Sequence, residues 1–227
     1  MPNLHLFSSP GKDDIRYVIE ASRPYLEGKD DVTVAYMPLA SLYAERWQGY
    51  TEDSFKGLAH LETLNAETMS LPQMEDIVRR AALVYISGGN TFLLNHRLHV
   101  SKLMLFLRKK VQAGLPVVAF SAGTVLCGPN ILTSKDMNTV STSFFEGLTA
   151  APFNFSAHYP LDAYGQSVKD EWLADYHFFH DNPIVMLSDG AHIKVDGKKA
   201  TLVSGEAWIW RKDEDKEQLE EGKLIVG

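Results

Sequence analysis

The chain has 227 residues, of which 45% are hydrophobic and 22% are charged. This composition disfavours a disordered chain and predicts one compact domain that spans residues 1–227. The formal net charge of −7 disfavours a nucleic-acid partner, which would require clustered Lys and Arg. The single cysteine, Cys127, cannot form an intrachain disulfide, no apolar run reaches the roughly 18 residues of a membrane span, and no signal peptide is apparent. We therefore expect a cytoplasmic protein with no membrane partner.

The first half of the chain alternates short apolar segments with segments of helical periodicity. The predicted strands span residues 3–8, 32–37, 83–86 and 116–120. The predicted helices span residues 13–27, 51–64 and 72–82, and a long helix after residue 90 ends near residue 112. The strand at 83–86 is apolar without alternation, as in a strand covered on both faces. This order predicts an α/β fold with a parallel sheet.

The second half of the chain is less regular. It contains a predicted strand at 153–157, a helix at 166–179 and a further strand at 183–187. Residues 191–195 and 200–210 flank an Asp-Gly turn and predict an antiparallel hairpin. The tail from residue 212 is charged, and we expect it to be solvated.

Ser121 follows the strand at 116–120 directly and precedes Ala122 and Gly123. A serine there lies at the carboxyl end of a parallel sheet, where α/β proteins bind ligands. Small neighbours allow a sharp turn that exposes the hydroxyl, and the N–H of Ala122 can face a developing oxyanion. The motif differs from G-x-S-x-G because Ala119 replaces the first glycine. The alternative is a serine that only caps a helix.

A second turn of small residues, Ser-Gly-Gly-Asn-Thr at 87–91, follows another buried strand. Gly88 and Gly89 permit positive φ and close approach of a ligand, and N–H groups at a helix start favour an oxyanion. An ordinary tight turn with Asn90 or Thr91 as the helix cap is the alternative. The spacing matches neither a dinucleotide motif nor a P-loop. Two such turns at strand ends predict one shared site.

A nucleophilic serine requires a base, and a histidine is the side chain best suited to exchange protons near neutral pH. His158 follows the apolar run at 153–157 and is the candidate base. Asp136 lies in a polar loop after the serine, where an ordinary turn aspartate is the alternative. His177 and His180 could contact a metal, but no third ligand follows at a recognisable spacing.

Four segments together make the chain resemble the peptidase E (aspartyl dipeptidase) family, whose wider relatives include cyanophycinases and class I glutamine amidotransferase-like proteins. The matching segments, in the order of the family, are 87–92, 121–123, 133–137 and 157–159. The resemblance covers most of the chain. It implies a serine peptidase with a three-layer, doubly wound, mostly parallel sheet and a C-terminal antiparallel hairpin, and it implies no metal and no cofactor.

The resemblance also assigns roles to particular residues. Ser121 matches the nucleophile of the family, His158 its histidine and Asp136 its aspartate, and these would form the catalytic triad. The oxyanion donors of the family fall on the backbone N–H groups of Gly89 and Ala122.

Substrate recognition is expected at the glycine turn and on the helix at 166–179. Gly88 and Asn90 match the substrate end of the pocket. The arginine that pairs with a substrate aspartate in the family has no counterpart, so Lys169 would supply a point charge instead. Asp170 and Glu171 would repel an acidic substrate. We therefore expect short peptides as substrates without strict Asp-X specificity.

Alternatives to this function remain open. A cyanophycinase-like or isoaspartyl-cleaving hydrolase would use the same three residues on a different amide. A catalytically silent amidotransferase-like binding domain is a second alternative. A flavodoxin-like electron carrier is disfavoured, because no flavin phosphate loop is apparent. We expect a monomer or a small homo-oligomer.

Overall fold

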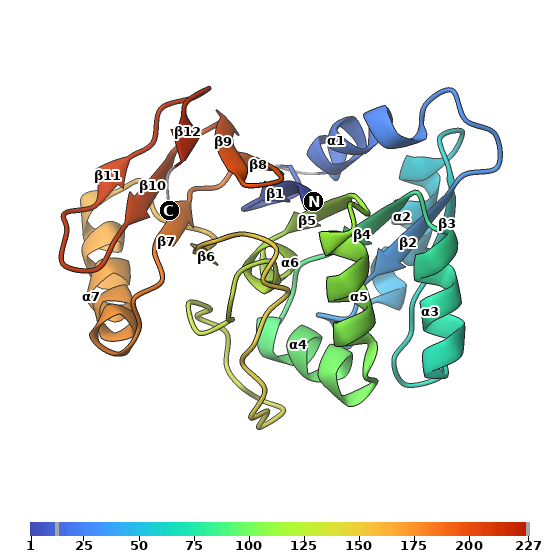
Figure 1. Cartoon of the computed structure of the whole chain (residues 1–227), viewed down its shortest axis with the longest axis horizontal. Helices are drawn as coiled ribbons and strands as arrows, with labels where there is room; N and C mark the ends of the chain where they lie inside the picture. The colour runs from blue at the N-terminus through green and yellow to red at the C-terminus, as the bar shows by residue number, and fades with distance from the viewer. Residues whose placement is uncertain (12–13, 226–227) are drawn as a thin grey trace.

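The computed structural model describes residues 1–11 and 14–225, which form two sheets with helices around them (Figure 1). The larger sheet has eight strands in the order β12-β9-β8-β1-β5-β4-β2-β3. Its parallel part consists of β1 (Asn3–Phe7), β5 (Val117–Phe120), β4 (Leu83–Ile86), β2 (Thr33–Met37) and β3 (His60–Thr63). The remaining strands, β8 (His192–Asp196), β9 (Lys199–Ser204) and β12 (Leu224–Ile225), pair antiparallel with their neighbours. The predicted mostly parallel α/β sheet is confirmed.

Helices cover both faces of this sheet (Figure 1). One face packs against α1 (Arg16–Leu26) and the end of α2 (Glu45–Phe55). The other face packs against α3 (Leu71–Arg80), α4 (Thr91–Val100), α5 (Leu103–Gln112) and α6 (Ala122–Leu126). Alternation along the strands divides the core accordingly: Val84 and Ile86 face α3 to α6, whereas Leu83 and Tyr85 face α1. This is the predicted three-layer arrangement.

The second sheet contains four strands in the order β11-β10-β7-β6. They are β6 (Asn154–Ser156), β7 (Ile184–Leu187), β10 (Ala207–Trp210) and β11 (Glu217–Gln218). Helix α7 (Ala163–Phe179) covers one face of this sheet, with Leu173 and Tyr176 packed in the same apolar cluster as Ile184 and Met186 (Figure 1). Val185 joins the core of the larger sheet instead. The second sheet thus holds α7 beside the ends of the parallel strands.

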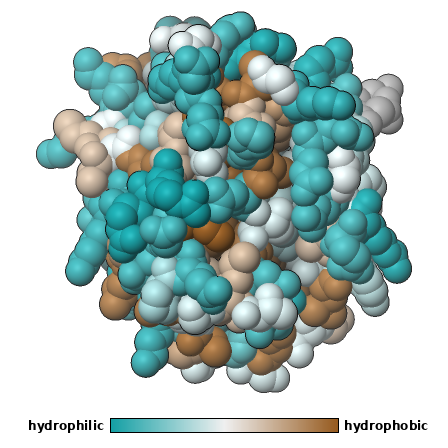
Figure 2. All heavy atoms as spheres, turned by 90° about the vertical axis from the view of Figure 1, so that its right-hand side faces the viewer, coloured by the Kyte–Doolittle hydropathy of each residue, from teal (hydrophilic) through white to brown (hydrophobic). Residues whose placement is uncertain are grey.

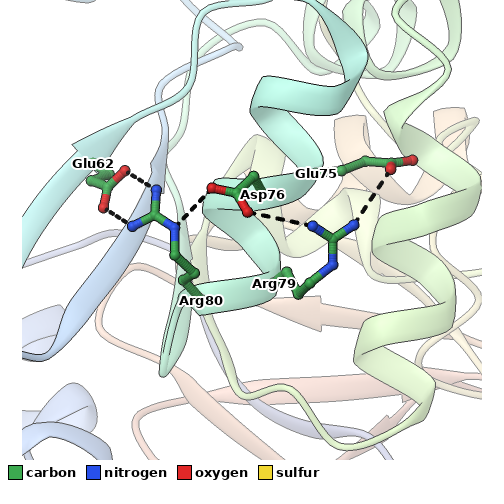
Figure 3. A network of polar contacts seen from close by, with 5 residues as sticks. All are labelled: Glu62, Glu75, Asp76, Arg79 and Arg80. Atoms are coloured by element: carbon green, nitrogen blue, oxygen red, sulfur yellow. Dashed lines mark hydrogen bonds and ion pairs between the residues drawn. The ribbon is translucent and has the colours of Figure 1, made fainter.

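The helix predicted at 51–64 is confirmed only for residues 51–55, because the chain leaves α2 at Phe55 and then forms the edge strand β3. Gly57 has a φ of +80°, a left-handed conformation that ends a helix. An ion-pair network then ties β3 to α3 (Figure 3): the guanidinium of Arg80 donates to both carboxylate oxygens of Glu62, at 2.7 and 2.9 Å, and to Asp76 at 2.9 Å. These ion pairs therefore add to the pairing of β3 with β2 and to the packing of the partly buried Leu61.

Three other predictions need correction. The long helix that ends near residue 112 is broken into α4 and α5 at Lys102, whose φ is 65°. The predicted strand at 200–210 divides near Gly205 (φ +81°), so that β9 completes the hairpin with β8 while β10 enters the second sheet. The tail is not wholly solvated, because β11 and β12 pair with β10 and β9. Residue 13, the predicted start of the first helix, lies outside the described residues.

The end of the molecule that carries β3 and α3 presents mostly hydrophilic residues to the viewer (Figure 2). Within residues 1–11 and 14–225, no helix combines the length and the apolar character needed to cross a bilayer.

Candidate active site

Ser121 occupies a strained turn between β5 and α6. Its φ of 50° and ψ of −114° are rare for a residue with a side chain, and its N–H donates to the carbonyl of Phe7 at 3.0 Å. Gly123 permits this turn, because a Cβ there would lie 2.6 Å from the carbonyl oxygen of Ile86 on β4. The close approach of α6 to the sheet thus projects the hydroxyl of Ser121 beyond the strand ends.

His158 follows β6 and lies opposite this serine. Its Nε2 is 3.0 Å from Oγ of Ser121. The backbone of His158 also has positive φ, 55°, and its N–H donates to Oγ of Ser8 at 2.7 Å. Two strained residues from different sheets therefore meet, and the structure brings these two predicted site residues together.

The carboxylate that contacts His158 belongs to Asp189, in the turn between β7 and β8. Its Oδ1 lies 2.6 Å from Nδ1 of His158 and accepts a further hydrogen bond from Oγ of Ser8 at 3.1 Å. Because a carboxylate only accepts, Nδ1 of the neutral ring carries the proton and Nε2 is free to accept from Ser121. The side chains of His158 and Asp189 are 52% and 66% exposed, so a substrate can reach them.

This arrangement corrects the predicted position of Asp136, which does not contact the imidazole. Its Oδ2 accepts hydrogen bonds from the N–H of Thr91 at 2.7 Å, from the hydroxyl of Thr91 at 2.6 Å and from the hydroxyl of Ser134 at 2.9 Å. The N–H of Thr91 is the first of α4, where a helix favours negative charge. Asp136 therefore accepts hydrogen bonds at the start of α4 and fixes the loop beside the serine. The carboxylate next to the imidazole is that of Asp189, which the sequence analysis does not identify.

The glycine turn lies against Ser121. A Cβ on Gly88 would approach Cβ of Ser121 to 3.0 Å. Gly89 has a φ of +136°, and a Cβ there would lie 2.4 Å from the carbonyl oxygen of Ala40, so both positions require glycine. Among the described residues, no acceptor is hydrogen-bonded to the N–H of Gly89 or of Ala122. Two backbone donors are thus available beside the hydroxyl.

Asn90 is engaged within the fold. Its side-chain oxygen accepts from the N–H of Leu93 at 2.9 Å, and Nδ2 donates to the carbonyl of Met137 at 2.8 Å. The first contact caps α4, and the second ties the glycine turn to the loop of Asp136. Asn90 therefore holds two walls of the site together, and a contact with substrate stays a prediction.

A cavity of about 180 Å³ opens at the hydroxyl of Ser121, and two lysines and one aspartate line it. It is lined by Ser121, His158, Asp136, Lys135 and Lys169, among others. Lys169 is only 5% exposed, and its Nζ donates to the carbonyl of Ala157. Burial, with a contribution from the nearby charge of Lys135, lowers the pKa of Lys169 to about 8.

The fold and this site place the chain among α/β serine hydrolases, in which a serine stands on a tight strand-to-helix turn next to a histidine. The chain belongs to peptidase family S51, whose model matches residues 5–203. It is a serine-type peptidase, and the resemblance inferred from its motifs is confirmed.

Individual relatives are similar in sequence to this chain over most of its length. A "Probable alpha-aspartyl dipeptidase" of Drosophila melanogaster is 32% identical over 195 residues, which cover 82% of this chain and 79% of the relative. A "Peptidase E" of Pasteurella multocida is 29% identical over 216 residues and covers 89% of each chain. The solved structure of a peptidase from an acI-B1 actinobacterium has a TM-score of 0.76 at 18% identity, covering 100% of this chain and 97% of that chain. This last likeness concerns the fold alone.

Proposed function

We propose that the chain hydrolyses short peptides by acyl transfer at Ser121, with His158 as the general base and Asp189 as the residue that orients the imidazole. The observation that carries this proposal is the continuous contact from Oγ of Ser121 to Nε2 of His158 at 3.0 Å and from Nδ1 to Asp189 at 2.6 Å. Such a chain of contacts activates an otherwise weak nucleophile.

The reaction proceeds in two steps. Oγ of Ser121 bonds to the substrate carbonyl carbon while its proton passes to Nε2 of His158, and the N–H groups of Gly89 and Ala122 stabilise the oxyanion. The leaving amine takes that proton as the C–N bond breaks. Water then attacks the acyl-enzyme, again with His158 as the base, and restores the serine.

The favoured acyl group is an N-terminal aspartyl residue. Supporting this are the names of the relatives, a peptidase E and an alpha-aspartyl dipeptidase, and the two lysines that line the small cavity. Asp170, expected to repel acidic substrates, instead contacts Lys216 at 2.5 Å and the hydroxyl of Tyr159 at 2.6 Å, so its charge is compensated. Because Lys169 is a point charge and not a bidentate fork, we expect discrimination between aspartyl and asparaginyl substrates to be modest.

The test is hydrolysis of Asp-Leu by the Ser121→Ala variant. We expect turnover to vanish while the thermal melt stays unchanged, and we expect a fluorophosphonate probe to label the wild type only. Ser204→Ala, which alters an exposed serine on β9, is the matched control and should keep full activity. Undiminished turnover by Ser121→Ala would remove the proposal. A β-linked aspartyl peptide assayed alongside tests the isoaspartyl alternative.

A further inference from the structure

A second, larger cavity is lined by Gly88 and Gly89 of the glycine turn. We propose that it binds the side chain of the residue released by the reaction, and that it selects large uncharged residues, aromatic ones above all. This inference rests on the proposed function, because it assigns the leaving-group half of the same substrate. Apart from Gly89, which is proposed as an oxyanion donor, the residues that line this cavity have no part in the proposed acyl-transfer chemistry.

The position of the cavity suits the leaving group. Gly88, Gly89 and Phe120 line it, and Phe120 directly precedes Ser121. The lysine-lined cavity is lined by Ser121 itself and by Thr91, which closely follows the two glycines in the sequence. A substrate whose scissile carbonyl is held at Ser121 therefore lies next to both cavities. With the N-terminal acidic residue among the lysines, the next residue is directed into the larger cavity.

The lining of the larger cavity is aromatic. Tyr36 and Tyr85 form its floor as a stacked pair with ring centroids 5.1 Å apart, and Phe120 continues the floor with its centroid 6.2 Å from that of Tyr85. Trp47 and Tyr50 of α2 stand at the rim and are 62% and 42% exposed. Large exposed aromatic side chains at the rim of a cavity are expected to be covered when a ligand binds.

The volume of the cavity and the charge of its lining limit which side chains it can bind. The volume is about 510 Å³ against about 180 Å³ for the lysine-lined cavity, which leaves room for a side chain as large as that of phenylalanine or tryptophan. Burial raises the pKa of both Tyr36 and Tyr85, so their hydroxyls stay neutral. Among the described residues that line this cavity, Asp14 is the only charged one. An acidic leaving residue is therefore disfavoured and a neutral apolar one is favoured.

The first experiment compares kcat/KM for Asp-Phe, Asp-Leu, Asp-Gly and Asp-Glu. We expect Asp-Phe to exceed Asp-Gly by at least about tenfold, the order of discrimination that an apolar pocket provides. Ala44→Trp places a large ring in the cavity and should bring this ratio towards one. Ala174→Trp adds the same ring to the exposed surface of α7 and should leave the ratio unchanged. Trp47→Ala, at an exposed position, should lower turnover of Asp-Phe while sparing Asp-Gly.

The second experiment measures binding without turnover. Calorimetry on the Ser121→Ala variant should show phenylalanine amide bound at least about tenfold more tightly than glycine amide. Adding Ala44→Trp to this variant should abolish the difference in affinity between the two amides. Tight binding of phenylalanine amide by a wild type that hydrolyses nothing would overturn the proposed function, and with it the leaving-group role of the cavity, while showing that the cavity still binds a large uncharged side chain. Hydrolysis of all four peptides at equal efficiency, with no preference between the two amides, would overturn this inference alone.

Discussion

Oγ of Ser8 donates a hydrogen bond to Oδ1 of Asp189 at 3.1 Å. The same hydroxyl accepts the N–H of His158 at 2.7 Å, and Ser8 is completely buried at the end of β1. Ser8 therefore links the residue that we propose as the base to the carboxylate that orients it, although it touches neither the serine nor the substrate cavities. Its hydroxyl is a positioning group.

We predict that Ser8→Ala lowers kcat for Asp-Leu by roughly tenfold with little change in KM, because the imidazole loses its backbone anchor and its geometry loosens. Steady-state kinetics measures this, and Ser8→Thr should recover part of the loss. Ser22→Ala is the matched control, since Ser22 is also fully buried and its hydroxyl donates to the carbonyl of Val18 within α1. Equal losses of kcat in the two alanine variants would show that Ser8 has only a structural role.

A second prediction separates the two aspartates. Asp189→Asn should lower kcat by at least about 100-fold, because Nδ1 of His158 loses its charged acceptor and the correct tautomer is no longer favoured. Asp136→Ala should instead cost about 2 kcal/mol of unfolding free energy, because hydrogen bonds at the start of α4 are lost. Kinetics and urea melts on both variants test this contrast. A larger loss of kcat in a folded Asp136→Asn variant than in Asp189→Asn would return Asp136 to the proposed triad.

A third prediction concerns pH. The pKa of Lys169 is lowered to about 8 by burial, so its charge is present below pH 8 and is lost as the pH rises through 8. We expect the ratio of kcat/KM for Asp-Leu to that for Asn-Leu to fall above pH 8, because only the aspartyl substrate needs the charge. Since both substrates share the same catalytic groups, the ratio isolates the lysine.

The variants at Lys169 sharpen this test. Lys169→Met should make the ratio small and independent of pH, and Lys169→Arg should extend the preference for Asp-Leu to higher pH, because arginine stays protonated. A ratio that is flat between pH 6 and 10 in the wild type would exclude Lys169 as the partner of the substrate carboxylate. For stability the sign is opposite: between about pH 8 and the ordinary lysine pKa the unfolded chain holds more protons, so folding becomes more favourable as the pH rises.

The sequence predicts the parallel core well because its strands are apolar and each is followed by a turn of small residues. Edge strands were harder: β3 carries Glu62 and a partly exposed surface, so its residues fitted a helical spacing equally well. The local pattern contains no sign of the charge network that fixes this strand.

The serine and the histidine could be identified because both follow predicted strands directly. Asp189 has a similar position, since it comes two residues after Leu187, the last residue of β7, with the buried Ser188 between them. The sequence does not single it out, because Ser-Asp-Gly at 188–190 is also an ordinary turn sequence. In addition, Asp136 lies in the segment 133–137, which resembles the family. Contact between residues 158 and 189 depends on how the second sheet meets the first, which no local pattern reports.

Strand β8 begins three residues after Asp189 and pairs antiparallel with β1, the strand that carries Ser8 at its end. Two strands that lie far apart in the sequence must therefore pair before the carboxylate reaches the imidazole. A nascent chain that ends before residue 196 would already contain Ser121 and His158 yet lack this pairing. Such a chain should accordingly show no peptide cleavage, although Ser121 and His158 are present.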